Sequence, residues 1–555
     1  MNNTFGLRKT LKTDILSKAV LSIVFGILNC LGYAYSKYFT MGMWVINKKA
    51  FIMFVFFVSI TSLTFYFFCT AAFAMFDKSR NLSNTEDVFW SHNVGWKCMG
   101  VIMTFRIPYF IISFPGATSV DSSYQLRQVF GNTPYSTQQP LFSTILLGLF
   151  VKAGGLLGNY DLGLFSYILF QSLVMAAAFS YSLKVLHSFE VHVYVKYFIL
   201  AVYAFLPMYG NFATMAVKDT LYASFSVFYV VTLSQMLAFY KRGESYDYAK
   251  YIPLYILSAS MITLFRSEGI YIVSVTALFL IFYYMRGQLL RKDKIICCIT
   301  FALPIIIWIG TMWVINVSLH PVKDTAREKL SVPFQQTARY LRDHPDDLSD
   351  EDRDAIESVI NYKWYEIGEK YDPVLADPIK NNYVRDADVN DLVNYFKAWG
   401  RGLFKHPASY IDTYLNHIFG WYYVGTDNDI RYEGKYGIFS DSLWGDRDVK
   451  YWIELLGDFP IFWVLQSAPI NIWMLILLTV YKVIRKDNDG FVGVAVFLYM
   501  GLVFCLLAPA FYLHPRYAFL IMFPMFYLVA FYACSKGLLS EEKALEQKHS
   551  KEKQR

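Results

Sequence analysis

The topology of this chain is decided by residues 114–148, FPGATSVDSSYQLRQVFGNTPYSTQQPLFSTILLG, a polar stretch that leads into an apolar run. Apolar runs close to the ~20 residues that cross a bilayer lie on both sides of this stretch. If the run at 140–157 also crosses the bilayer, every later loop changes side. The stretch holds Asp121, and a carboxylate beside membrane spans typically acts on a molecule of the bilayer.

Composition and apolar runs predict an all-α polytopic membrane protein. Of the 555 residues, 55% are hydrophobic and 17% are charged, and the hydrophobic residues gather in runs long enough to span a bilayer. We expect twelve transmembrane helices, near residues 15–35, 50–75, 98–114, 162–186, 197–216, 220–240, 251–265, 270–285, 295–318, 460–482, 491–511 and 517–534.

The run at 140–157 is assigned from the distribution of basic residues. A span there would place KRGESYDYAK (241–250) and MRGQLLRKDK (285–294) outside, whereas short cytoplasmic loops carry the excess of Lys and Arg. We therefore predict that 140–157 is an external juxtamembrane helix and that both termini are cytoplasmic in a multi-pass protein of the cell membrane. Only the loop with Lys37, Lys48 and Lys49 departs from this rule.

This topology divides the chain into five parts. They are a two-span anchor with a cytoplasmic loop (1–97), a transmembrane module (98–318) with an external loop at 115–139 and the juxtamembrane helix at 140–157, an external hydrophilic segment (319–459), C-terminal transmembrane helices (460–534) and a cytoplasmic polar tail (535–555).

The hydrophilic segment is acidic. Residues 319–455 carry 25 acidic residues against 17 Lys and Arg, a net charge of −8, which excludes a typical nucleic-acid binder. The net charge of +7 of the whole chain comes from the cytoplasmic loops. LSDEDRDAIESVI (348–360) places Ser349 as an N-cap before acidic residues, so the segment is expected to be a small, mostly helical unit.

Asp121 is the candidate general base of this external face. Transfer of a group from a phosphate carrier to a hydroxyl needs a base for the acceptor proton and cations for the departing phosphate. Partial burial would raise the pKa of Asp121 toward neutrality. The alternative is that Asp121 caps the helix that begins at SSYQLRQ (122–128), and one residue can do both.

Further polar residues are expected on the same face, and each has two possible roles. Lys218 and Asp219 are either an ion pair at the start of a helix, with Asp219 as its N-cap, or a phosphate-binding cation and a second catalytic carboxylate. Arg266 and Glu268 are either a salt bridge or part of a phosphate site. Arg516 either binds a phosphate group through its guanidinium fork or snorkels at a helix end. The expected substrate-binding residues are Glu268, His514, Tyr517 and Gln125.

The order of these features resembles the GT-C superfamily of polytopic glycosyltransferases, which take sugars from polyprenyl-phosphate donors. The blocks PYFIISFPGATSVDSSYQ, REKLSVPFQQTARYL, YDPVLADPIKN, KHPASYI and HPRYAFLIMFP are similar to an uncharacterised family of bacterial membrane proteins related to that superfamily. Relatives place His before the proline that here is Pro140, whereas this chain has Gln138 and Gln139. Some superfamily members use a divalent cation, so the resemblance allows Mg²⁺ or Mn²⁺ between Asp121 and Asp219.

The resemblance implies an inverting glycosyltransferase that moves a sugar from a polyprenyl-phosphate-linked donor to a glycan, lipid or protein acceptor of the cell envelope. Its partners would be this donor, the acceptor and membrane lipids, without nucleic acid. A transporter or flippase of lipid-linked glycans is the main alternative, in which the polar residues line a path. A noncatalytic membrane scaffold is the third.

Overall fold

A computed structural model of the protein describes residues 2–38, 48–82, 87–241, 250–287, 291–323, 326–373, 375–426, 436–442, 445–487, 489–508 and 515–535. The α-helices are α1 (Asn2–Tyr38), α2 (Lys48–Asn81), α3 (Val94–Ser113), α4 (Val120–Val129), α5 (Leu141–Leu156), α6 (Tyr160–Ser188), α7 (Val193–Phe205), α8 (Pro207–Thr214), α9 (Lys218–Lys241), α10 (Ile252–Phe265), α11 (Gly269–Arg286), α12 (Arg291–Leu319), α13 (Ser331–Asp343), α14 (Asp350–Glu357), α15 (Trp364–Glu369), α16 (Asp377–Lys380), α17 (Val389–Lys405), α18 (Pro407–His417), α19 (Asp446–Gly457), α20 (Pro460–Gln466), α21 (Ala468–Arg485), α22 (Phe491–Leu506) and α23 (Phe519–Cys534). Short 3-10 helices are η1 (Val88–Trp90), η3 (Ala326–Leu330), η4 (Pro345–Asp347), η5 (Phe419–Trp421) and η6 (Pro515–Ala518).

The described chain is an all-α protein with long apolar helices, as the sequence predicts. Eight helical stretches within the described ranges are long and apolar enough to cross a membrane: Thr13–Lys37, Lys48–Arg80, Tyr160–Ser188, Lys218–Tyr240, Gly269–Arg286, Arg291–Leu319, Ala468–Arg485 and Pro515–Cys534. The bent pair α7 and α8 makes a ninth if it is one span. A membrane-embedded helical protein is therefore supported.

The difference from the twelve expected spans lies mainly in helix length. The 14 residues of α10 extend about 21 Å at 1.5 Å per residue, which is short of a ~30 Å hydrocarbon core. α22 has 16 residues, and α3 is not among the eight stretches either. The expected span at 460–482 is also interrupted, because α20 ends at Gln466 and α21 begins at Ala468.

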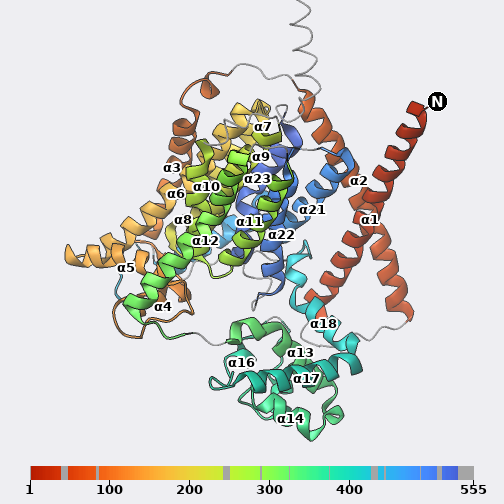
Figure 1. Ribbon diagram of the computed structural model, residues 1–555, viewed down its shortest axis with the longest axis vertical. Coiled ribbons are helices and arrows are strands. Elements are labelled where there is room, and N and C mark those ends of the chain that lie inside the picture. Colours follow the sequence, from red (N-terminus) through yellow and green to blue (C-terminus); the bar gives the residue numbers. More distant parts are fainter. Residues whose placement is uncertain are drawn as a thin grey trace, which may run out of the picture.

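The long helices form a bundle whose two ends differ (Figure 1). At the end where α1 begins, Arg80 at the end of α2 donates to the carbonyls of Tyr532 and Ala533 at the end of α23, at 2.6 and 3.0 Å. Ser535 there donates to the carbonyl of Phe189, just after α6, at 2.9 Å. The other end holds α4 and the helices α13–α18.

Residues 326–417, which we call the helical unit, have a hydrophobic core of their own. Its buried side chains include Phe334, Ile356, Ile367 and Tyr395, and they form a cluster separate from that of the bundle. Ser349 caps α14 by accepting a hydrogen bond from the Asp352 backbone N–H, so its predicted N-cap role is confirmed. The mostly helical character of the hydrophilic segment is confirmed over this range.

Two hydrogen bonds of α18 join the helical unit to the bundle. The Tyr35 hydroxyl at the end of α1 donates to Asp412 of α18 at 2.7 Å. The ring Nε2 of His417 lies 3.0 Å from the carbonyl oxygen of Ala508, which follows α22. Since these contacts join α18 to the ends of α1 and α22, the unit has a defined place at one end of the bundle.

The segment between α3 and α6 is held against the bundle by a short strand pair that the sequence does not predict. β1 (Ala117–Thr118) pairs in parallel with β2 (Met215–Ala216). Gly116 precedes β1 with φ +126°, and a Cβ there would lie 2.7 Å from Cγ1 of Ile168. Only glycine suits this backbone conformation and this close approach. The pair places α4 directly beside the start of α9.

α5 forms a helix over the residues predicted for the juxtamembrane helix, and it packs against α4 and α6. Gln125 of α4 donates to the hydroxyls of Ser143 and Thr144 of α5, at 2.7 and 3.1 Å. Gly154 of α5 lies so close to Gly163 of α6 that a Cβ would be 2.4 Å from the Gly163 backbone nitrogen. α5 lies at the edge of the bundle, in close contact with α6 (Figure 1).

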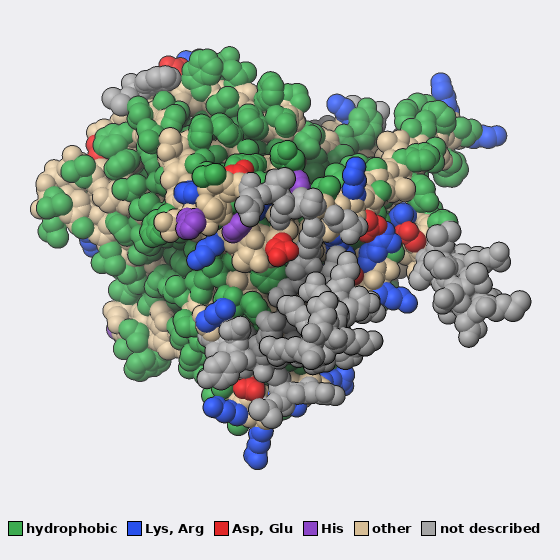
Figure 2. Space-filling view, turned by 90° about the horizontal axis from the view of Figure 1, so that it is seen from above, with side chains coloured by type: hydrophobic (Ala, Val, Ile, Leu, Met, Phe, Trp, Pro, Cys, Tyr) green, Lys and Arg blue, Asp and Glu red, His purple; other side chains and the backbone are tan. Residues whose placement is uncertain are grey.

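The outer surface of the bundle is apolar, as lipid contact requires. Phe67 of α2 and Trp313 of α12 have exposed fractions of 62% and 66%. Seen from the end opposite the helical unit, hydrophobic side chains cover most of the outline and Lys and Arg side chains are scattered over the end face (Figure 2). A surface of this kind is stable when lipid replaces water around it.

The two ends of the bundle are expected to lie on opposite sides of the membrane. Glu351 in α14 and His92 before α3 are exposed at opposite ends. A membrane-impermeant thiol reagent should label Glu351→Cys in intact cells and should label His92→Cys only after permeabilisation, because the basic loops favour the cytoplasm. The parent chain is the control, since its seven cysteines are buried or partly buried. Equal labelling of both variants in intact cells would contradict this arrangement.

Candidate functional site

Four segments far apart in the sequence meet at the end of the bundle that bears the helical unit. They are the first turn of α4, the first turn of α9, the turn between α10 and α11, and η6. Ser119 caps α4 through a capping box with Ser122. Asp121 therefore does not cap this helix, which corrects that alternative and leaves its carboxylate free for tertiary contacts.

The Asp121 carboxylate is shared by two cations and an amide. Its Oδ2 accepts from Lys218 Nζ at 3.0 Å and from Arg516 Nη1 at 3.4 Å. Its Oδ1 accepts from Gln139 Nε2 at 3.2 Å. Lys218 also donates to Oε1 of Gln139, so Gln139 bridges the carboxylate and the ammonium group.

These contacts reverse the pKa expected for Asp121. Burial by itself raises the pKa of this carboxyl, but the charges of Lys218 and Arg516 and the hydrogen bond from Lys218 outweigh burial and hold the pKa well below its usual range. The expected shift toward neutrality is therefore wrong for the protein without a ligand. Asp121 is ionised at neutral pH and is a weak base while both cations contact it.

A second, more buried group of charges surrounds Arg266. Its guanidinium donates to Asp219 through Nη1 and contacts Glu268 through Nε. The same guanidinium lies 5.6 Å from the ring centre of Tyr222 and 4.9 Å from that of Tyr517. Two carboxylates and two aromatic faces fix this arginine, because each favours a cation.

The two groups carry opposite excess charge. Asp121, Lys218 and Arg516, which we call the outer triad, have one carboxylate for two cations. Their side chains are 28%, 11% and 21% exposed. The inner triad of Arg266, Asp219 and Glu268 has one cation for two carboxylates, and its side chains are 9%, 2% and 21% exposed. An excess positive charge thus lies at the more accessible side of the cluster.

Most sequence-predicted residues come together here, and some alternatives are corrected. Lys218 and Asp219 do not pair with each other, because Lys218 contacts Asp121 and Asp219 contacts Arg266. Asp219 does not cap α9, which begins at Lys218. The salt bridge between Arg266 and Glu268 is present. Arg516 points into the cluster instead of snorkelling outward, since its guanidinium contacts Asp121.

The structure gives a different result for each of three further residues, Gln125, His514 and Gln139. Gln125 is 2% exposed, and its amide hydrogen bonds join α4 to α5, so it holds the helix that carries Asp121. His514 lies outside the described residues. Gln139 is the residue that sequence reasoning missed as a member of the site. Its position directly before Pro140, at the start of α5, was the available signal.

A divalent cation between Asp121 and Asp219 finds no support in this arrangement. Each carboxylate faces cationic side chains. The group of three metal-ligand side chains that the described ranges contain is His344, Asp347 and His406, in the helical unit. Mg²⁺ or Mn²⁺ at the cluster would have to displace Lys218 or Arg266 from a carboxylate oxygen.

Comparison with known proteins gives one family. The model described as "Family of unknown function (DUF6020)" matches residues 131–553, and the chain therefore belongs to this family. The matched region includes Gln139, Lys218, Arg266 and Arg516, whereas Asp121 precedes it. No curated protein and no solved structure matches the chain.

The contact between Asp121 and Lys218 should be measurable as a coupling energy. In a double-mutant cycle, Asp121→Asn and Lys218→Met should be less than additive by about 1–3 kcal/mol, as for a partly buried charge-assisted hydrogen bond. Unfolding would be followed by denaturant titration in detergent. The matched control combines Asp121→Asn with Lys152→Met, an exposed lysine of α5, and should be additive. Additivity in the test pair would show that the contact contributes no stability.

Proposed function

We propose that this DUF6020 protein is a GT-C-type membrane glycosyltransferase. It transfers a sugar from a polyprenyl-phosphate-linked donor to a glycan, lipid or protein acceptor of the cell envelope, with inversion. The observation that carries the proposal is the outer triad, in which Lys218 and Arg516 share the single carboxylate of Asp121. Two cations with one anionic partner match a phosphate group, and a carboxylate beside them matches a base.

The topology proposed with this function has twelve membrane passages. α3, α7 with α8, α10 and α22 supply four of them beside the eight stretches given above, and α5 lies along the membrane surface. The cluster and the helical unit are external, both termini are cytoplasmic, and the protein resides in the cell membrane. A donor held in the bilayer by its prenyl chain then presents its phosphate to the outer triad.

The proposed reaction assigns a step to each of these side chains. Donor phosphate oxygens bind Lys218 and Arg516, whose guanidinium fork fits two oxygens. The acceptor hydroxyl oxygen forms a bond to the anomeric carbon while the bond from that carbon to the phosphate oxygen breaks. The hydroxyl proton passes to Asp121, and the departing polyprenyl phosphate keeps its electron pair and its two cations. One displacement inverts the anomeric centre.

Donor binding also changes Asp121 from a paired anion to a base. A phosphate that takes Lys218 and Arg516 neutralises the two cations that lower the pKa of Asp121 most. Burial, which raises this pKa, then remains. The carboxylate therefore gains basicity only when a donor is present. Arg266 stays in place because Asp219 and Glu268 hold it, so we assign Asp219 a positioning role.

Transport of a lipid-linked glycan is the second candidate. α7 and α8 are bent by 45° at their break, and α8 leads into β2 directly before Lys218. Broken helices that end near a polar site occur in transporters. A flippase moves the donor lipid intact, whereas a transferase releases polyprenyl phosphate. An assay in nanodiscs with a panel of polyprenyl-phosphate sugars tests the transferase directly through release of that product.

Substitutions of Asp121 and Arg516 should have opposite effects on binding and turnover. Asp121→Asn removes the base and the anion that competes with phosphate, so turnover should fall at least ~100-fold while donor affinity stays equal or rises. Arg516→Lys keeps the charge but loses the fork, so donor affinity should fall, and Arg516→Ala should cost about 1.5–3 kcal/mol. Donor affinity would be measured by equilibrium binding and turnover by product release.

The control for both substitutions is Lys152→Met, which leaves the cluster intact and should behave as wild type. Glycan transfer at the wild-type rate by Asp121→Asn would remove this residue as the base. Normal donor affinity in Arg516→Ala would make Lys218 the principal phosphate ligand.

The pH dependence should distinguish the free enzyme from the donor complex. The acid limb of kcat/KM reports the free enzyme, in which Lys218 and Arg516 hold the pKa of Asp121 well below its usual range. The acid limb of kcat reports the donor complex, in which those cations bind phosphate. The acid limb of kcat should therefore lie at higher pH than that of kcat/KM. Coincident limbs would contradict the exchange of partners.

A further inference from the structure

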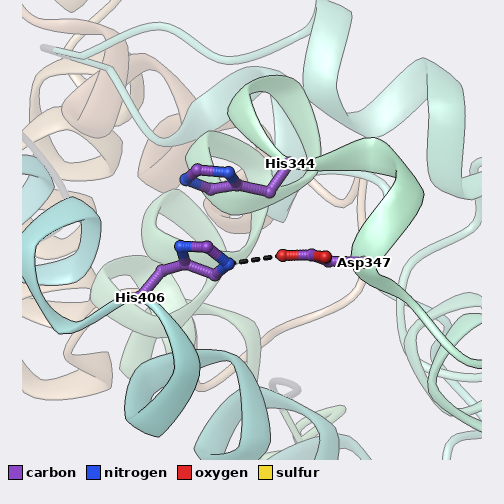
Figure 3. Close-up of side chains that lie close together, drawn as sticks. All are labelled: His344, Asp347 and His406. Carbon is purple, nitrogen blue, oxygen red and sulfur yellow. Dashed lines mark hydrogen bonds and ion pairs between the residues drawn. The ribbon is translucent and has the colours of Figure 1, made fainter.

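A second group of polar side chains, separate from the outer triad, lies in the helical unit. His344 follows α13, Asp347 ends η4, and His406 stands between α17 and α18. Their ligand atoms lie within 4.8 Å of one another. Figure 3 shows the two imidazoles stacked and the Asp347 carboxylate in line with the ring nitrogen of His406. We propose that His344, Asp347 and His406 form a site for a divalent transition metal such as Zn²⁺.

The ligand set is chemically suited to this ion. Imidazole nitrogen and carboxylate oxygen are common zinc ligands, and three protein ligands leave a fourth position for water. Zn–N and Zn–O bonds of about 2.0–2.2 Å in a tetrahedron require ligand atoms roughly 3.3 Å apart. The present separations are within 4.8 Å, and the two stacked imidazoles turn on metal binding so that both ring planes contain the ion. The side chains of His406 and Asp347 are 27% and 34% exposed, which gives the ion a path from solvent.

The backbone prepares both histidines for this role. Pro345 and Pro407 follow them directly, and a residue before proline is disfavoured in helical conformation. Both histidines accordingly leave the helix, with closely similar φ and ψ of −140° and 54° for His344 and −132° and 60° for His406. Tyr340 packs against both rings, with ring centres 6.0 and 5.7 Å away.

Two helix ends independently favour a cation at this place. α13 and α17 both end here, with 13 and 17 residues, and the C-terminus of a helix carries partial negative charge. The ammonium group of Lys405 lies at this place. Its Nζ is 3.1 Å from Oδ1 of Asp347 and donates to the Asp347 carbonyl oxygen at 3.1 Å. The Lys405 side chain is 51% exposed, so it can turn to solvent when a metal takes the carboxylate.

A bound metal would join the end of α13 to the junction of α17 and α18 and thereby fix the fold of the helical unit.

The test is metal binding to the purified full-length protein in detergent, after removal of any affinity tag and treatment with a chelator. Zn²⁺ would be titrated against a chromophoric competitor, and Co²⁺ would be followed by its visible absorption. We expect one equivalent to bind, with Co²⁺ bands of the intensity typical of four-coordinate sites. His344→Ala and His406→Ala should each weaken binding at least ~10-fold.

Two variants make the test specific. Lys405→Gln removes the competing cation and should bind Zn²⁺ several-fold more tightly, whereas a purely structural ion pair predicts no gain. His92→Ala, at an exposed histidine of the opposite end, should bind as wild type. Absence of saturable binding to the wild type, wild-type affinity in His344→Ala and His406→Ala, or no gain in Lys405→Gln would overturn the proposal. The Co²⁺ spectrum of the wild type decides it even if a histidine variant fails to fold.

Discussion

The structure depends on how the negative charge of the Asp121 carboxylate is neutralised at the edge of an apolar helix bundle. Its two cationic partners, Lys218 and Arg516, are 97 and 395 residues away along the chain. A carboxylate in such surroundings needs cations, and cations there need a carboxylate. The first turn of α4, the start of α9 and η6 are therefore positioned by one shared interaction, with Gln139, just before α5, as a bridge.

The polar groups at the other end of the bundle show what a balanced cluster looks like. There Arg80 and Lys482 meet Asp487 and Asp489, and both cations also donate to the carbonyl of Tyr532. Each charge has an opposite charge, and helix C-terminal carbonyls, which lack intrahelical partners, take the remaining donors. In the outer triad, by contrast, two cations make direct contact with one carboxylate. That difference is the observation on which the proposed anionic ligand rests.

The local structure around Asp121 explains how one carboxylate reaches both cations. The capping box of Ser119 and Ser122 satisfies the start of α4, the strand pair aligns the loop with β2, and Gln125 joins α4 to α5. Each of these contacts involves neutral groups. These neutral contacts hold the position of Asp121 and leave its carboxylate to the two cations.

The sequence by itself determined the class of protein, the long apolar helices, the helix at 140–157, the helical character and Ser349 cap of the acidic segment, and the residue types of the cluster. Hydrophobic runs and charge distribution are patterns of residues close together in the chain, so they can be recognised from the sequence alone. Tertiary structure alone decided which charges pair, because Lys218 and Asp219 are neighbours in sequence yet point to different partners. It also decided the direction of the Asp121 pKa shift, since burial and cations oppose each other and only their positions show which effect is larger. The membership of Gln139 and the meeting of His344 with His406 depended likewise on chain segments brought together by packing.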